Sequence, residues 1–150
     1  MSHLHDPGSR QRVRYLRSRD GVQLAWAEAG EGAVVVKAAN WLTHLDHDHE
    51  TFVWRHWLTG LADGRTLLRY DERGCGMSDW DVESFEFDDW VDDLELVVDA
   101  AGLDRFPLLG VSQGAAVAVA FAARHPDRVS RLILCGGYGR GRALRATTEE

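Results

Sequence analysis

The sequence predicts an α/β fold in which a mostly parallel sheet carries helices on both faces. Short aliphatic runs alternate with segments whose apolar residues recur at helical spacing. Such alternation favours parallel strands, because each parallel connection needs a crossover. The chain also opens with two strand-like runs, Val13 to Arg19 and Val22 to Ala29, joined by Asp20-Gly21. That dipeptide between two such runs predicts an antiparallel hairpin at the start of the sheet.

After the hairpin, strands and helices alternate to the end of the predicted sheet. The Val34-Val35-Val36 run suits a strand buried on both faces. Two later stripes of apolar residues have helical spacing, and Gly102 ends the second where a helix C-cap belongs. Pro126 stops an alanine-rich third helix. The predicted strands are Ala33 to Ala38, Thr66 to Tyr70, Phe106 to Val111 and Val129 to Cys135, and the predicted helices are Trp54 to Leu61, Phe87 to Ala101 and Gln113 to Arg124.

The 150 residues suit a single domain without internal repeats or linkers. Residues 1–12 are polar and predict a flexible lead-in. Residues 13–135 hold all the predicted strands and helices. Residues 136–150 contain four glycines and three arginines without apolar periodicity, which indicates a loop or a truncated end.

Composition narrows the location and partners of the chain. A formal net charge of −7 argues against nucleic acid as a partner of this segment. Cys75 and Cys135 are too few for a disulfide framework, and nothing resembles a signal peptide. The longest apolar run, Ala115 to Ala123, is too short to span a bilayer. We therefore expect a cytoplasmic protein without membrane contact.

The main candidate for chemistry is Ser112, in the pentapeptide Gly110-Val111-Ser112-Gln113-Gly114. Gly-x-Ser-x-Gly is a weak signal alone, but here it lies between a buried strand and a buried helix, the context of a nucleophile elbow. The sharp turn forces the serine into strained backbone angles, and the crowding around it requires Gly110 and Gly114. It also aims the Gln113 N–H and the helix N-terminus at an oxyanion forming on Ser112. The alternative interpretation is a structural glycine turn in which the serine has no catalytic role.

Two further motifs support a family resemblance. Tyr70-Asp71-Glu72-Arg73-Gly74-Cys75-Gly76-Met77-Ser78-Asp79 precedes the elbow, and His125-Pro126-Asp127-Arg128-Val129 follows it. Together these motifs resemble the α/β-hydrolase superfamily, from about Val13 to Cys135. The segment Lys37-Ala38-Ala39-Asn40-Trp41-Leu42-Thr43-His44-Leu45 is most similar to bacterial hydrolase-like domains that precede helix-turn-helix regulators or nucleotide cyclases.

The resemblance implies a serine-type hydrolase of esters, amides or similar acyl compounds, with Ser112 as nucleophile. Family hydrolases usually have His-Gly after the third strand, and the following residues supply the second oxyanion donor. Here Ala38-Ala39-Asn40-Trp41 fills that stretch, so the backbone N–H of Asn40 or Trp41 would serve. The larger side chains would reshape the pocket, for which Trp41 and His44 are the candidate lining residues.

The triad acid and histidine of the family follow the nucleophile, beyond the sixth strand where this chain is truncated. No histidine follows His125, and His125 lies at the far end of the helix that starts at Gln113. At about 1.5 Å per residue, His125 is about 18 Å along that helix from Ser112 and cannot be the base. We therefore expect the 150-residue chain alone to be inactive.

A histidine cluster, His44, His47 and His49 with carboxylates between them, allows a zinc site. The segment is short and offers no recognisable partners for the imidazoles, so solvated loop histidines are the favoured interpretation. We expect neither a metal nor a cofactor.

Two other functions remain open. The pocket of a hydrolase-like domain can sense a small molecule for an attached output domain, or the chain can be a catalytically incomplete fragment. In each case the partner of the pocket is a small-molecule substrate or ligand. The strand Val129 to Cys135 would be an unprotected edge, so we also expect possible self-association through it.

Overall fold

The structure is a computed structural model that describes residues 11–139. Of the predicted lead-in, only Gln11 and Arg12 are described, and Arg12 already belongs to the first strand. Of the predicted tail, residues 136–139 are described. The strands are β1 (Arg12–Arg17), β2 (Gln23–Gly30), β3 (Ala33–Lys37), β4 (Arg65–Tyr70), β5 (Phe106–Val111) and β6 (Val129–Cys135), and the helices are α1 (Arg55–Ala62), α2 (Phe87–Ala100) and α3 (Gln113–Arg124).

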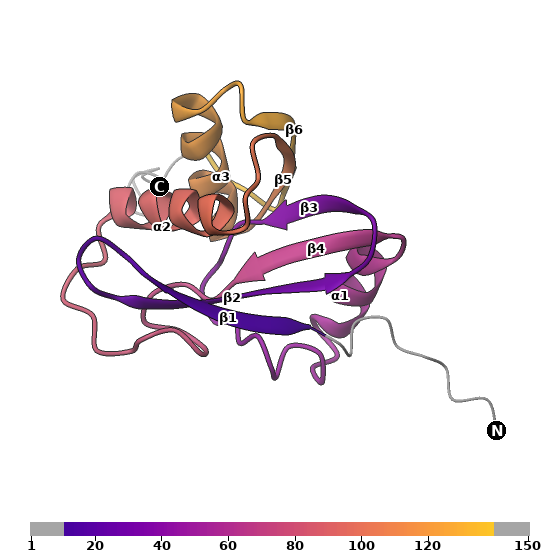
Figure 1. Cartoon of the computed structure of the whole chain (residues 1–150), viewed down its shortest axis with the longest axis horizontal. Coiled ribbons are helices and arrows are strands. Elements are labelled where there is room, and N and C mark those ends of the chain that lie inside the picture. The colour runs from indigo at the N-terminus through magenta and orange to yellow at the C-terminus, as the bar shows by residue number, and fades with distance from the viewer. Residues whose placement is uncertain (1–10, 140–150) are drawn as a thin grey trace, which may run out of the picture.

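The strands form one mixed sheet in the order β1-β2-β4-β3-β5-β6 (Figure 1). β2 pairs antiparallel with β1 and with β4, whereas β4, β3, β5 and β6 are parallel to one another. The predicted hairpin is present, and its Gly21 has a φ of 91°. The α/β fold with a mostly parallel sheet is confirmed. The carboxyl ends of the adjacent strands β3 and β5 meet at one edge, where open α/β sheets place their sites.

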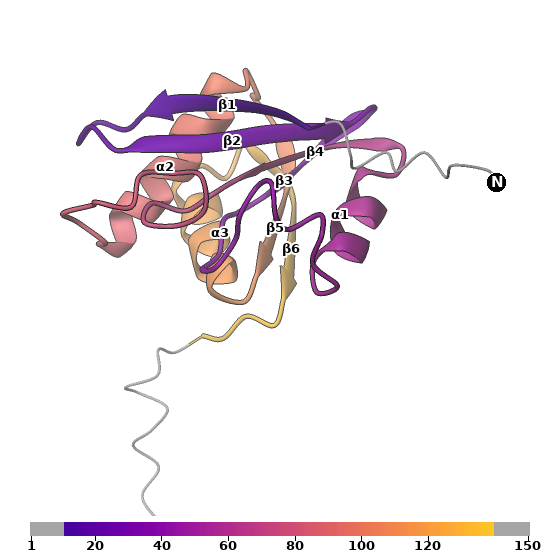
Figure 2. The same ribbon diagram turned by 90° about the horizontal axis from the view of Figure 1, so that it is seen from below.

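Helices cover both faces of the sheet, as predicted. Successive strand residues point to opposite faces, so Val35 packs in one core cluster and Val36 in another. The Val35 cluster includes Leu58 of α1, and the Val36 cluster includes residues of α2 and α3. Figure 2 shows α1 on one side of the sheet and α2 and α3 on the other. None of the helices described within residues 11–139 is long and apolar enough to cross a membrane.

Arg73, in the loop after β4, joins three parts of the fold. Its guanidinium is buried and donates two hydrogen bonds to the Asp93 carboxylate of α2, at 2.7 and 2.8 Å. A third bond, at 2.7 Å, reaches Asp20 in the hairpin turn. The bonds to Asp93 raise the pKa of Arg73 above its usual value, so this arginine stays charged. It therefore ties the loop that contains it to the hairpin and to α2.

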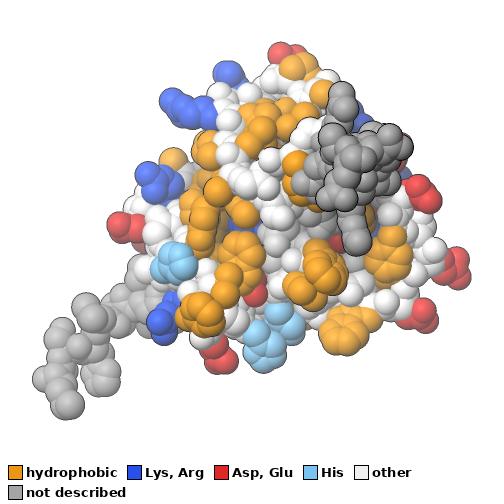
Figure 3. Space-filling model, turned by 180° about the vertical axis from the view of Figure 1, so that it is seen from behind, with side chains coloured by type: hydrophobic (Ala, Val, Ile, Leu, Met, Phe, Trp, Pro, Cys, Tyr) orange, Lys and Arg blue, Asp and Glu red, His pale blue; other side chains and the backbone are white. Residues whose placement is uncertain are grey.

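Within residues 11–139, β6 is an edge of the sheet and pairs with β5 alone. Leu132, Ile133 and Leu134 are 39%, 46% and 48% exposed. Because these neighbours alternate between faces, both faces of β6 are left open by the part of the chain that is described. Figure 3 shows hydrophobic side chains gathered over the rear of the molecule. The predicted edge is therefore open.

Candidate active site

Ser112 is the single residue between the end of β5 and the start of α3. Its backbone has φ 52° and ψ −120°, angles that a residue with a side chain rarely adopts. Among the described residues, Leu42 is the only other non-glycine with a positive φ. The Ser112 side chain is exposed. The strained strand-to-helix turn that the sequence predicted is therefore present.

Gly110 and Gly114 allow this turn to close. A Cβ on Gly110 would lie 2.6 Å from the Cα of Ala115 and 2.7 Å from the Gly114 carbonyl oxygen. A Cβ on Gly114 would lie 2.6 Å from the carbonyl oxygen of Ala39, in the loop after β3. These contacts involve backbone, which cannot move aside easily. The second glycine thus brings the β3 loop close to the start of α3, a role that the motif alone did not reveal.

The backbone around Ser112 is held in place on one side and available on the other. Ser112 donates its N–H to the Cys135 carbonyl at the end of β6, at 2.9 Å. Gln113 occupies the first position of α3, where backbone N–H groups have no acceptor within the helix. The helix macrodipole places partial positive charge at this end. The Gln113 N–H is thus suited to stabilise negative charge beside Ser112.

Ser112 opens into a cavity of about 380 Å³ that is lined by Asn40, Trp41, Ser112, Gln113 and Tyr138. Four of these residues were predicted from the sequence. Tyr138 was not, although it follows the carboxyl end of β6, at the same edge of the sheet. The glycine-rich segment around it was interpreted as a plain loop. Its position just after the carboxyl end of a strand is the sequence signal that could have identified it.

His44, a candidate lining residue from the sequence, is not among the described residues that line this cavity. Its Nδ1 lies 3.3 Å from the Asp46 backbone N and 3.4 Å from that of His47. Its ring stacks on the His47 ring, with 4.2 Å between the centroids. The buried carboxylate of Asp48 accepts the His44 backbone N–H at 3.2 Å. These local contacts turn the His44 side chain toward its own loop.

The loop that carries Asn40 and Trp41 is fixed by buried polar groups. The Lys37 ammonium is buried and donates to the Asn40 side-chain oxygen at 2.5 Å. The Asn40 amide in turn donates to the Trp41 carbonyl at 3.1 Å. Burial lowers the pKa of Lys37 to about 8. The side chain of Asn40 therefore holds the backbone beside the cavity.

The Trp41 backbone N–H is already in use. It donates to the side-chain oxygen Oε1 of Gln113 at 2.8 Å. Asn40 and Trp41 were equivalent oxyanion donors from the sequence, but in this structure the Trp41 N–H points to Gln113. The Asn40 N–H is therefore the remaining candidate donor from this loop.

Glu72 is a polar residue of the site that sequence reasoning missed. Its side chain is buried, and its Oε1 lies 3.4 Å from Nε2 of Gln113. Burial raises the pKa of the Glu72 carboxyl to about 7, although the Gln113 hydrogen bond opposes this. Glu72 lies within the Tyr70–Asp79 motif, but nothing in the motif marked it as a residue of the site.

Asp71 of the same motif secures the loops behind the cavity. Its Oδ2 accepts the backbone N–H groups of Leu45 at 2.9 Å and Met77 at 2.8 Å. A Cβ on Gly76 would lie 2.2 Å from that oxygen. Asp71 and Gly76 therefore shape the loops rather than face the cavity.

No histidine among residues 11–139 lines the Ser112 cavity. The ring of His125, at the C-cap of α3, lies 4.8 Å from that of Phe121 between centroids, and its Nε2 lies 3.4 Å from Glu95. His125 therefore belongs to the far end of α3, as the sequence predicted. In the same range, no group of three or more histidine, cysteine, aspartate or glutamate side chains is arranged to hold a metal ion.

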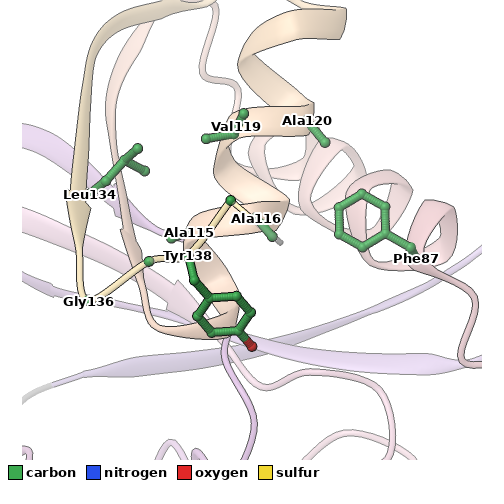
Figure 4. A pocket seen from close by; sticks show the side chains of 10 residues that line it. Phe87, Ala115, Ala116, Val119, Ala120, Leu134, Gly136 and Tyr138 are labelled. Atoms are coloured by element: carbon green, nitrogen blue, oxygen red, sulfur yellow. The ribbon is translucent and has the colours of Figure 1, made fainter. Parts of the chain in front are cut away.

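A second hollow, of about 610 Å³, lies along α3 and meets the Ser112 cavity at Tyr138. Figure 4 shows Leu134 of β6 on one side of α3 and Phe87 of α2 on the other. Its walls include Ala115, Val119 and Ala120 of α3. This groove is lined mainly by apolar side chains, and it lies next to the exposed strand β6.

Residues 46–147 match the family model described as the alpha/beta hydrolase fold. The match covers more than half of the chain, and the chain belongs to the α/β-hydrolase family. A hydrolase from Pseudomonas aeruginosa PA01 has the same architecture, with a TM-score of 0.76 and 26% identity over 89% of this chain and 49% of that one.

Two curated relatives show how much of the family this chain represents. The 2-hydroxymuconate semialdehyde hydrolase of Pseudomonas sp. CF600 is 38% identical over 57% of this chain and 31% of its own length. The cis-3-alkyl-4-alkyloxetan-2-one decarboxylase of Shewanella oneidensis is 28% identical over 81% of this chain and 37% of its own. The chain thus spans about a third of the curated relatives it matches.

Proposed function

We propose that this chain is the nucleophile-bearing part of a serine-type hydrolase of esters, amides or similar acyl compounds. The observation that carries the proposal is the strained backbone of Ser112, which exposes its hydroxyl at a cavity beside the N-terminus of α3. The N–H groups of Gln113 and Asn40 are the proposed oxyanion donors. The hydrolase relative supports hydrolytic chemistry. The decarboxylase relative shows that proteins similar to this chain catalyse more than one kind of reaction.

In the proposed reaction, Ser112 Oγ attacks the acyl carbon and its proton passes to a base. The carbonyl electrons move onto oxygen, where the two N–H groups stabilise the negative charge. The carbonyl reforms as the bond to the leaving group breaks, and the leaving group takes the proton. Water then attacks the acyl-serine by the same steps and releases the acid.

The base and its partner acid would come from chain beyond the described residues. No described histidine lines the cavity, so we propose that the chain alone turns over esters poorly. Loss of a triad base leaves a residual enhancement of about 10³ to 10⁴ where the oxyanion site is intact. We place the protein in the cytoplasm, with a small molecule rather than nucleic acid or membrane as the ligand of this part of the chain.

The test uses imidazole in solution as a substitute for the missing base. Purified chain is treated with a fluorophosphonate, with and without imidazole, and the modified peptide is identified by mass spectrometry. We expect imidazole to increase the phosphonylation of Ser112 by at least about tenfold, because it takes the Oγ proton. The Ser112→Ala variant is the control for other nucleophiles. Equal modification of other serines would contradict the proposal.

A ligand-sensing module of a bacterial regulator is the second candidate. The apolar groove along α3 favours it, since the groove adjoins the Ser112 cavity and offers a small molecule an apolar wall. A sensor needs the pocket but not the reaction, so small-molecule binding would be unaffected by Ser112→Ala. In that case imidazole would also give no increase in Ser112 phosphonylation.

A further inference from the structure

We propose that Glu72 and Gln113 form a positioning pair that fixes the Asn40–Trp41 backbone relative to Ser112. The inference rests on the proposed function, because it explains how the second oxyanion donor is held. Gln113 would then have two roles: its backbone N–H faces the oxyanion, and its side chain orients the loop that carries the other donor. Glu72 acts only through Gln113 and has no contact with substrate.

The hydrogen bonds of the pair allow only one orientation of the Gln113 amide. Trp41 offers a backbone N–H, so the group facing it at 2.8 Å has to be the Gln113 oxygen. An ionised Glu72 accepts only, so the group facing it at 3.4 Å has to be the Gln113 nitrogen. Both neighbours therefore select the same rotamer of the amide.

The other side of the loop is held independently. The buried Lys37 ammonium binds the Asn40 side chain at 2.5 Å. The loop is thus fixed from β3 through Asn40 and from α3 through Trp41. Loss of the Gln113 contact would therefore release only the Trp41 end of this loop from α3, and the Asn40 end would stay bound to Lys37.

The location of Glu72 is costly for a group without a role. It is 5% exposed and lies beside Tyr70, Trp90 and Asp93, and the Asp93 carboxylate adds to the effect of burial in raising the Glu72 pKa. The indole nitrogen of Trp90 is buried without a hydrogen-bond partner in the structure. A buried carboxyl with a pKa raised to about 7 changes charge near neutral pH. Protonation weakens its bond to Gln113, because a neutral oxygen is a poorer acceptor than a carboxylate.

The test follows the backbone amide of Trp41 by NMR in the intact 150-residue chain between pH 5 and 9. We expect its chemical shift to titrate with a midpoint near 7, because Glu72 acts on it through Gln113. Glu72→Gln keeps an acceptor of the same shape and removes the step near 7, whereas any step near 8 from Lys37, which holds the other side of the loop, would remain. Glu95→Gln is the matched control: it makes the same chemical change at a half-buried position on α2, and should leave the titration intact.

A second variant, Gln113→Leu, removes both polar ends of the side chain at similar volume. We expect the Trp41 amide to exchange with solvent about two- to tenfold faster, as a lost hydrogen bond of ordinary strength implies. The Leu45 amide, bonded to Asp71, is the internal reference for folding. A flat Trp41 titration in the native chain, or unchanged Trp41 exchange in Gln113→Leu, would overturn the pair.

Neither measurement involves the reaction of Ser112. Failure of the positioning pair therefore appears as an unresponsive Trp41 amide, whereas failure of the proposed function appears as an unreactive Ser112. The two outcomes are separate.

Discussion

The loop after β4, which contains Arg73, and the edge strand β6, which contains Ile133, differ in how completely they are enclosed. Arg73 is 2% exposed and binds carboxylates from two other parts of the fold. Ile133 is 46% exposed on a strand with one neighbour. The described residues enclose the Arg73 loop but leave strand β6 exposed.

The difference shows which part of the fold positions the nucleophile. The Ser112 turn is held mainly by β5, α3 and the loops after β3 and β4. At the open edge, the Cys135 carbonyl of β6 accepts the Ser112 N–H, and Tyr138, which follows β6, lines the cavity. The geometry around Ser112 is therefore present in a chain that spans about a third of its curated relatives.

The largest effect is expected at Arg73. Arg73→Met leaves the buried Asp93 carboxylate without its partner, and breaking a buried pair in this way costs about 3 to 5 kcal/mol. The free energy of unfolding at pH 7, measured with urea, checks this. Arg124→Met removes an exposed arginine that binds Asp88 and Asp92, and should cost less than about 1 kcal/mol. Equal losses would remove the distinction between enclosed and exposed ion pairs.

A smaller loss is expected at the turn. Gly114→Ala brings a Cβ to 2.6 Å from the Ala39 carbonyl oxygen, which forces the loop after β3 away from α3. Overpacking of this kind costs about 1 to 3 kcal/mol. Gly60→Ala is the control, since nothing lies within 4 Å of its added Cβ in α1 and alanine favours helix by up to about 1 kcal/mol. Thermal melts of both variants should therefore shift in opposite directions.

The smallest effect depends on pH. Because the pKa of Glu72 is raised to about 7 from 4.5, the folded state binds its proton more tightly than the unfolded state. Glu72 thus contributes stability at acidic pH that is lost as the pH rises through 7. Glu72→Gln removes that dependence. The difference in the free energy of unfolding between the variant and the unaltered chain should therefore be about 1 to 2 kcal/mol more favourable to the variant at pH 9 than at pH 5. Parallel curves for both proteins would show that Glu72 is not buried as described.

The sequence predicted the fold well because each signal is local. The bounds of β5, α3 and β6 coincide with those predicted, since the apolar runs end at Ser112, at Pro126 and at Gly136. Hydrophobic spacing and turn residues depend on a few neighbours along the chain.

The site was predicted less completely because its contacts join segments far apart in sequence. Gln113 meets Trp41 and Glu72, which are 72 and 41 residues away. Side-chain hydrogen bonds over such separations leave no periodic signal. For the same reason the sequence could not show that Tyr138 reaches the Ser112 cavity.

The open edge of β6 gives the most direct test of the difference between the two regions. Sedimentation velocity of the purified chain over a range of concentrations should show oligomers, since an apolar edge with unpaired N–H and C=O groups recruits other strands. Ile133→Lys should shift the chain toward monomer, whereas Arg131→Lys on the same strand should not. A monodisperse monomer of the unaltered chain, with a sharp cooperative melt, would contradict the account, because it would mean that the chain covers its own edge.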